Sequence, residues 1–167
     1  IKALEALEKK GSIYLARGSG IYVRNQKRDG YLNLFSSSGF SDEIVGHSVT
    51  NHVIRVDEVP APEEVRQKLK LNEGTEVYVL ERIVHIDGNV LCYEKSYFNK
   101  DIVLYLDTSI AEGSIFRYLE KNLKVKIGFS DIYFTVDKLD IDEASLLNLS
   151  ASDPCLRYEP IFYTTTG

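Results

Sequence analysis

The sequence has few of the residues that build disulfide frameworks or metal sites. Its two cysteines, Cys92 and Cys155, are far apart and belong to no CxxC pattern or Cys/His cluster. The three histidines, at positions 47, 52 and 85, do not have the spacing of metal ligands. These absences argue against a disulfide-rich fold and against a zinc site. We therefore expect reduced cysteines, no metal and no cofactor.

Long apolar runs are also missing. No run approaches the ~20 residues needed to cross a bilayer, and the N-terminus lacks a charged start followed by a long apolar stretch. We expect a cytosolic protein without membrane association. The chain of 167 residues is 44% hydrophobic and 27% charged, which is typical of one main globular domain. It begins with Ile1 and stops directly after an apolar run, so both ends are expected to be cut.

Charge is divided unevenly along the chain. Residues 1–28 carry seven basic side chains and two acidic ones, a net charge of +5. The whole chain has a net charge of −5, so the remainder must be −10. This division predicts either that the N-terminal piece contacts a polyanion while the larger piece avoids one, or that the N-terminal piece is a solvated basic tail.

The first 30 residues show a helix, a hairpin and a linker. Residues 1–10 place apolar side chains on one helical stripe, and Gly11 follows as a stop. The β-branched and aromatic runs at 12–16 and 21–24 flank Arg17-Gly18-Ser19-Gly20, which predicts a hairpin because glycine accommodates the positive φ of a tight turn. The polar residues 25–30 are interpreted as a linker.

The larger part of the chain predicts an α+β fold. Two long β-rich runs meet at Asp87-Gly88 and indicate a central hairpin. Pro62 is expected in the first turn of a helix, and Ser109 to Glu112 are spaced as the capping box of a single helix over 109–122. Strands are also expected over 48–59, 124–138 and 155–163, with a helix capped by Asp140 or Asp142 before the last one. Hairpins with single interspersed helices favour a mainly antiparallel sheet covered on one face over a parallel doubly wound sheet.

The opening IKALEALEKKGSIYLARGSGIYV resembles the end of a GntR-type winged helix: the tail of the recognition helix, a glycine, and a wing whose tip reads RGxG. The resemblance implies that residues 1–24 are the remnant of a DNA-binding domain. Arg17, Ser19 and the backbone at Gly18 and Gly20 would then approach DNA at the wing. Lys2 would face phosphates or base edges. The alternative for Arg17 is a solvated turn arginine.

Residues 31–167 resemble the UTRA domain of the HutC subfamily within the GntR superfamily, a domain whose fold is similar to that of chorismate lyase. Four pieces carry the resemblance, the longest being PAPEEVRQKLKLNEGTEVYVLERIVHIDGNVLCYEKSYF. The others are EGSIFRYLE, KIGFSDIYFTVDKLDIDEASLLNL and CLRYEPIFY. The resemblance implies a small-molecule effector domain that modulates DNA binding, and it places further pocket residues beyond position 167.

The resemblance implies an effector site on the central hairpin. Sugar-phosphate-binding members of the family present two arginines one residue apart to the phosphate; here Arg82 matches the first, and Val84 stands at the second. A single arginine can still bind a phosphate or carboxylate in bidentate fashion. Glu94 matches a position that bonds ligand hydroxyls or amides. The alternative is an ion pair between Arg82 and Glu94, and both arrangements can hold in different states.

Four serines and a tyrosine complete the expected site. Ser114 matches a serine at the start of the family's helix, where free N–H groups favour an anion; an ordinary capping serine is the alternative. Ser36, Ser37 and Ser38 precede a possible short helix from Ser41 to Val45, and Tyr97 is the last candidate.

An enzyme resembling chorismate lyase is the alternative function. The sequence contains no Gly-rich phosphate loop and no GxSxG, and a helix start accounts for the acidic group at Asp140, Asp142 and Glu143. An enzyme would therefore rest on fold analogy alone. We expect instead a repressor that binds a palindromic operator as a homodimer and responds to a small metabolite of the sugar-phosphate type.

Overall fold

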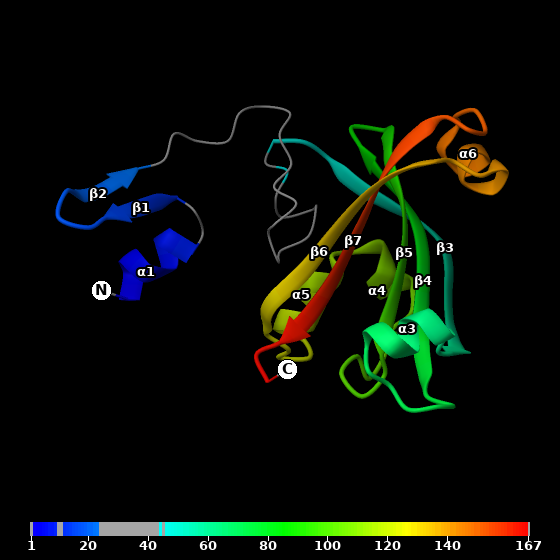
Figure 1. Ribbon diagram of the computed structural model, residues 1–167, viewed down its shortest axis with the longest axis horizontal. Coiled ribbons are helices and arrows are strands. Elements are labelled where there is room, and N and C mark those ends of the chain that lie inside the picture. Colours follow the sequence, from blue (N-terminus) through cyan, green and yellow to red (C-terminus); the bar gives the residue numbers. More distant parts are fainter. Residues whose placement is uncertain (1, 10–11, 24–43, 45, 167) are drawn as a thin grey trace. The chain divides into compact units, whose positions relative to one another are not determined.

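The computed structural model describes residues 2–9, 12–23, 44 and 46–166. The chain divides into two compact units, Ile1–Leu32 and Asn33–Gly167, and each is described by itself (Figure 1). The predicted linker at 25–30, the boundary at residue 31 and the possible helix at 41–45 lie at least partly outside the described residues. The domain limits predicted from the sequence therefore stay predictions.

The N-terminal unit contains one helix and one hairpin, as the sequence predicts. Helix α1 spans Lys2–Lys9, and strands β1 (Ile13–Ala16) and β2 (Gly20–Val23) pair antiparallel. Ile13 is the buried residue of this hairpin, at 7% exposure. Tyr14 and Tyr22 face each other across the strands with their rings stacked 5.2 Å apart.

The larger unit is built on a three-stranded antiparallel sheet in the order β3-β4-β5. Strand β3 spans Val49–Pro60, β4 spans Glu76–Ile86 and β5 spans Asn89–Asn99. The predicted central hairpin is confirmed: Asp87 and Gly88 have φ values of +49° and +80°, the positive values that a tight two-residue turn requires. Bulges interrupt the register between Val53 and Arg55 on β3 and at the β4–β5 turn.

Strand β4 lies in the middle of this sheet and carries the largest fully buried side chains, Val77, Val79, Leu80 and Val84. Side chains alternate along a strand, so Tyr78, Leu80, Arg82 and Val84 share one face. Tyr78 and Leu80 pack there against a cluster from the next part of the chain, formed by Val103, Leu106, Ala111, Ile115 and Leu119.

Two short helices cover that face, where the sequence predicted one. Helix α4 spans Thr108–Glu112 and α5 spans Ile115–Lys121. The single helix expected over 109–122 is therefore wrong, because the chain becomes extended at Gly113, with φ −89° and ψ −163°. The expected capping box at Ser109 is wrong as well. Asp107 caps α4, its side chain accepting from the Ile110 N–H at 2.8 Å.

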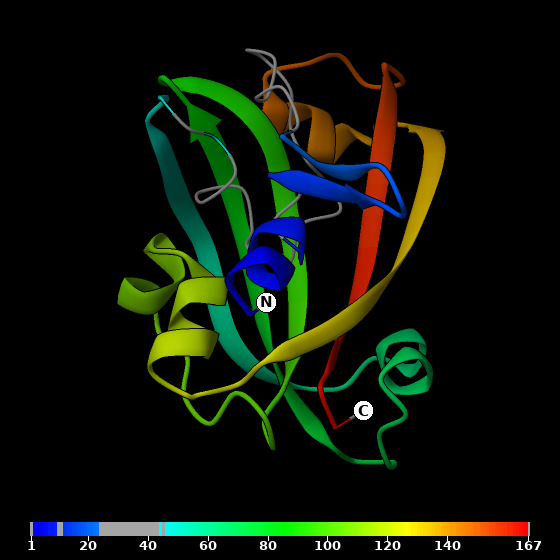
Figure 2. The ribbon, with the colours of Figure 1, turned by 90° about the vertical axis from the view of Figure 1, so that its left-hand side faces the viewer.

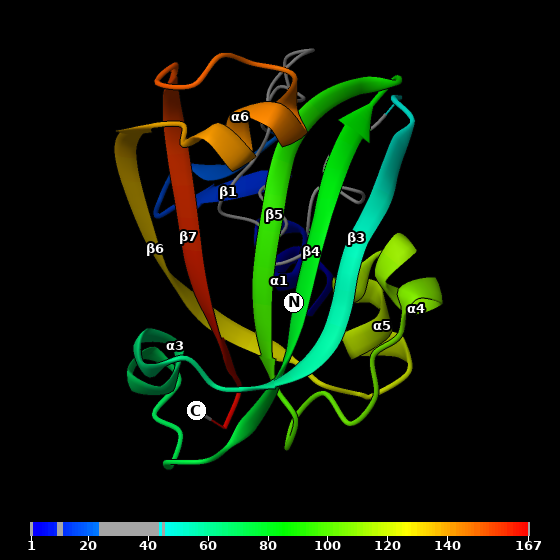
Figure 3. The same cartoon turned by 90° about the vertical axis from the view of Figure 1, so that its right-hand side faces the viewer.

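The other face of the sheet has helices too, so the expectation of cover on one face only is wrong. Helix α3 (Glu63–Lys68) begins after Pro62, which is its N-cap and not a first-turn residue as predicted. Helix α6 (Ile141–Leu147) packs near β5 and is capped by Asp140, one of the two caps predicted, which forms a capping box with Glu143. Figures 2 and 3, which view the molecule from opposite sides, show α4 and α5 on one side of the sheet and α6 on the other.

The last two strands form a separate ribbon. Strands β6 (Ile127–Lys138) and β7 (Pro154–Thr164) pair antiparallel, and Figure 3 shows them beside the edge marked by β5. The described strands thus make an α+β fold with antiparallel pairing throughout, which confirms the predicted class. Among the described helices, none is long and apolar enough to cross a membrane.

Candidate ligand-binding site

Arg82 lies at the centre of the predicted site and is almost fully buried, at 8% exposure. Its Nε and Nη2 atoms both lie 2.9 Å from Oε2 of Glu94, the residue opposite it on β5. Its Nη1 donates to the carbonyl oxygens of Ala111 at 2.7 Å and Gly113 at 3.1 Å. The guanidinium therefore joins the central hairpin to the end of α4.

Glu94 is held from both sides of its carboxylate. One oxygen accepts from Arg82, and the other accepts from the Ser96 hydroxyl at 2.8 Å. The ion pair predicted as an alternative is thus present. Its partners remain partly accessible, with 10% of the Arg82 side chain and 24% of the Glu94 side chain exposed.

Ser114 follows Gly113, the residue whose carbonyl accepts from Arg82. Its hydroxyl accepts from the Arg117 N–H at 3.3 Å and caps α5, which is the capping role given as an alternative. Ser114 also lines a groove of about 360 Å³ together with polar and basic side chains of the two helices, Ser109, Arg117, Lys121 and Asn122. The structure therefore joins Arg82 and Glu94 directly and places Ser114 next in the chain to Gly113, whose carbonyl Arg82 binds.

The floor around Arg82 is apolar. Val84, the residue that stands where the family has a second arginine, is 1% exposed and points to the same face as Arg82. Cys92 pairs with Val84 across the strands, and burial raises the pKa of its thiol to about 12. Neither residue adds positive charge, so Arg82 is the cation that this face of the hairpin supplies.

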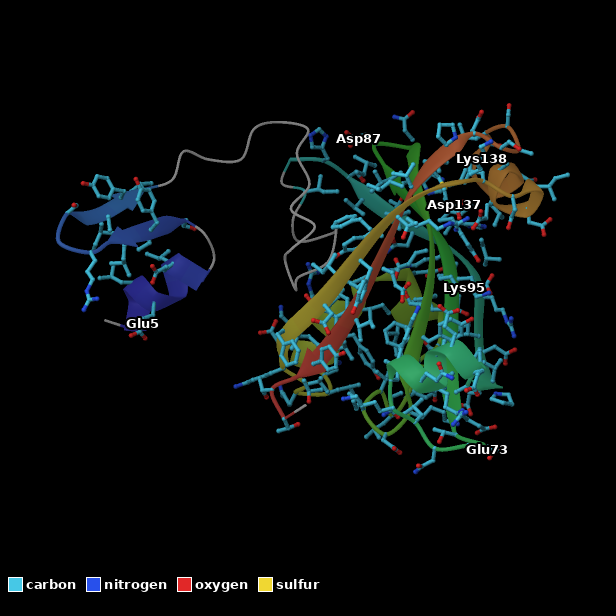
Figure 4. All side chains as sticks on the ribbon, viewed as in Figure 1. Glu5, Glu73, Asp87, Lys95, Asp137 and Lys138 are labelled. Carbon is cyan, nitrogen blue, oxygen red and sulfur yellow. The ribbon has the colours of Figure 1, made fainter. Side chains whose placement is uncertain are left out.

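Tyr97 does not join this group. It pairs with Val79 and lies on the opposite face of the sheet, together with the neighbouring pair Glu81 and Lys95. On that face Lys95 Nζ lies 3.2 Å from Glu81, and the Tyr93 hydroxyl donates to Glu81 at 2.9 Å. Figure 4 shows Lys95 at the side of the sheet away from α5.

The wing residues form the predicted tight turn. Gly18 and Gly20 have φ values of +82° and +118°, so the backbone there takes a conformation that L side chains rarely adopt. The Tyr22 hydroxyl donates to the Ser19 carbonyl at 3.1 Å and braces the tip. Arg17 and Ser19 are exposed. Lys2 is the first residue of α1.

The serines at 36, 37 and 38 lie outside the described residues, so their predicted role stays a prediction. The structure adds one residue that the sequence argument missed, Asn51 on β3, whose Nδ2 donates to the carbonyls of Glu112 and Gly113. The sequence pattern could have indicated this residue: Asn51 alternates with Val49 and Val53 and is therefore a polar residue on an apolar strand face. In the described part of the chain, no group of three or more His, Cys, Asp or Glu residues could hold a metal ion.

An antiparallel α+β domain with a largely buried pair of arginine and glutamate on its central hairpin favours a ligand-binding domain. Comparison with known proteins identifies which kind. Residues 45–167 match the UTRA domain family. The chain belongs to the GntR family of helix-turn-helix transcriptional regulators that carry a UTRA domain, and most of its length is that domain.

Three relatives illustrate the match. The chain is 43% identical over 166 residues to the HTH-type transcriptional regulator YydK of Bacillus subtilis, covering 99% of this chain and 70% of the relative. The crystal structure of YydK superimposes with a TM-score of 0.89, at 42% identity over 99% of this chain and 72% of the other. A gene product of Staphylococcus aureus is 50% identical, with a TM-score of 0.77 over 81% of this chain and 85% of that chain.

A more distant structure, the effector domain of PhnF from Mycobacterium smegmatis, has a TM-score of 0.69 at 18% identity, over 78% of this chain and 82% of that one. This likeness shows the fold alone. The curated relatives are transcriptional regulators and not enzymes, so the lyase alternative is set aside.

Proposed function

We propose that the protein is a repressor whose UTRA domain binds a small metabolite of the sugar-phosphate type and thereby changes its affinity for operator DNA. The observation that supports the proposal is the partly accessible ion pair of Arg82 and Glu94, whose arginine also binds the carbonyl of Gly113 next to Ser114. Arg82 would bind the anionic group in bidentate fashion, and Glu94 would accept from the sugar hydroxyls. A regulator of this kind would work in the cytosol, where its DNA target lies.

The DNA contacts belong to the N-terminal unit. We propose that the exposed Arg17 and the backbone at Gly18, Ser19 and Gly20 enter a groove from the wing, with Lys2 nearby on α1. Two chains would form a homodimer, and each would contact one half of a palindromic operator. A ligand can shift such a system only by its different affinity for two states, so those states must differ at Arg82 or its partners.

The test is a thermal-shift screen of phosphorylated sugars and amino sugars against the full-length protein. A ligand at a hundredfold excess over its Kd stabilises the native state by ~2.7 kcal/mol. Arg82→Ala should abolish that shift and leave ligand-free operator binding intact. The matched control is Arg55→Ala, because Arg55 lies on β3 with its side chain 45% exposed and pairs with Glu81 on the opposite face.

Two outcomes would count against this assignment. The first is a ligand that shifts wild-type protein and Arg82→Ala equally. The second is an Arg82→Ala variant that folds and responds to the ligand but no longer binds the operator.

A further inference from the structure

The break between α4 and α5 leaves three consecutive carbonyl groups without helical partners. The last carbonyls of any helix lack intrahelical donors, and a buried carbonyl without a donor is costly. Here the break is fixed close to the core, because Ala111 is 0% and Ile115 is 3% exposed. The Ala111 carbonyl is buried and therefore needs a donor from the protein, whereas Glu112 and Gly113 are exposed residues whose carbonyls face the edge of the break.

Two side chains on neighbouring strands donate to these carbonyls. Arg82 on β4 donates to the carbonyls of Ala111 and Gly113. Asn51 on β3 donates to those of Glu112 at 3.0 Å and Gly113 at 3.2 Å. The two side chains share a face of the sheet because Val53, two residues after Asn51, pairs with Arg82. The Gly113 carbonyl is thus held by both.

This sharing matters when a ligand binds, if the proposed function is right. Arg82 already divides its N–H groups between Glu94 and the two carbonyls. An anion that takes up Arg82 competes with those contacts, since the planar guanidinium has five donors in fixed directions. Asn51 shares no hydrogen bond with Glu94, so it can keep its hydrogen bond to the Gly113 carbonyl while Arg82 binds the ligand.

We propose that Asn51 is a positioning residue of the effector site: its hydrogen bonds to the Glu112 and Gly113 carbonyls hold the α4–α5 turn in place when Arg82 binds an anion. This inference rests on the proposed function and adds a residue that does not itself touch the ligand. Asn51 is the third residue of β3, so the same two hydrogen bonds also tie the α4–α5 turn to this strand.

The experiment measures binding of inorganic phosphate and of glucose 6-phosphate to the full-length protein by calorimetry and thermal shift. Four variants are compared with wild type: Asn51→Ala, Asn51→Leu, Arg82→Ala and, as the matched control, Thr50→Ala. Thr50 adjoins Asn51 but points to the opposite face. We expect Arg82→Ala to lose binding, both Asn51 variants to bind about tenfold more weakly, and Thr50→Ala to match wild type.

Leucine separates donation from packing, because it has the same branching and number of side-chain heavy atoms as asparagine, is somewhat larger, and has no N–H group. If Asn51→Leu regained wild-type affinity, only volume would matter and the proposal would fall. Hydrogen exchange of the ligand-free variants gives a second measurement. Exchange should quicken at residues 114–118 and not throughout the domain; a uniform increase would mean general destabilisation and would overturn the positioning role.

The outcomes also separate this inference from the proposed function. If Arg82→Ala loses binding while both Asn51 variants bind as wild type does, the Asn51 role is wrong and the anion site stands. If wild type binds neither probe, or Arg82→Ala binds as well as wild type, the anion site itself is wrong and the Asn51 role falls with it.

Discussion

Two neighbouring ion pairs on the same two strands end up in different surroundings. Glu81 pairs with Lys95, and Arg82 pairs with Glu94, in adjacent positions of the β4–β5 register. The first pair has side-chain exposures of 16% and 45%, and the second has 10% and 24%. The second pair is also joined to helix carbonyls. Pairing across strands is thus common to both, and the cover given by α4 and α5 is what makes one of them a candidate site.

The largest effect should come from removing the packing under Arg82. Leu80 is 0% exposed and contacts the cluster of α4 and α5. Leu80→Ala should lower the free energy of unfolding by about 2–5 kcal/mol, measured by urea denaturation, because the transfer energy is lost and a cavity remains. The control is Ile54→Ala, since Ile54 is 42% exposed and should cost far less. Equal costs would mean that the face of Arg82 is not the better packed one.

The next effect tests the buried pair itself. Glu94→Ala leaves the Arg82 guanidinium, 8% exposed, without its carboxylate. We expect a loss of about 2 kcal/mol in unfolding free energy, the usual size for hydrogen bonds to charged groups. Glu94→Gln keeps an acceptor and should cost less. The contrast between the two faces breaks down if Glu94→Ala proves no more costly than removing Lys95 from the exposed pair.

That exposed pair should contribute little. Lys95→Ala should change the free energy of unfolding by less than about 1 kcal/mol, because a solvated ion pair gains little in water and is screened by salt. The same urea titration repeated at high salt should reduce the difference further. A loss that is large and independent of salt would show that Lys95 is as important to stability as Arg82.

The smallest effect is a shift in a titration curve. Burial raises the pKa of Glu81, but the hydrogen bonds from Tyr93 and Lys95 lower it by more, so the net shift is downward. A depressed carboxyl pKa stabilises the fold above the ordinary glutamate range, about 4.3, and that contribution is lost as pH falls through the lower folded value. Tyr93→Phe should move the pKa of Glu81 upward and shrink the acid-labile contribution, as followed by carboxyl NMR. No movement would exclude the Tyr93 bond as a cause.

Local patterns in the sequence were enough for several elements. The Asp87-Gly88 turn, the wing glycines and the helix cap at Asp140 all depend on residues close together in the chain, and all three are present. The α+β class followed from the order of these elements, and the likeness to UTRA domains agreed with it. Short-range backbone preferences act on neighbouring residues, which is why they can be deduced without a structure.

The environment of Arg82 depended on contacts between distant segments. The sequence suggested a partner in Glu94, but the break at Gly113 and the donors from Asn51 and Arg82 bring together residues about 30 to 60 positions apart. Pairing register and side-chain alternation also put Tyr97 on the opposite face from Glu94. Such choices are set by burial and by the need to satisfy buried carbonyls, and both are properties of the packed molecule as a whole. The sequence by itself determined the turns, the cap at Asp140 and the fold class, and tertiary packing decided which polar groups meet at Arg82.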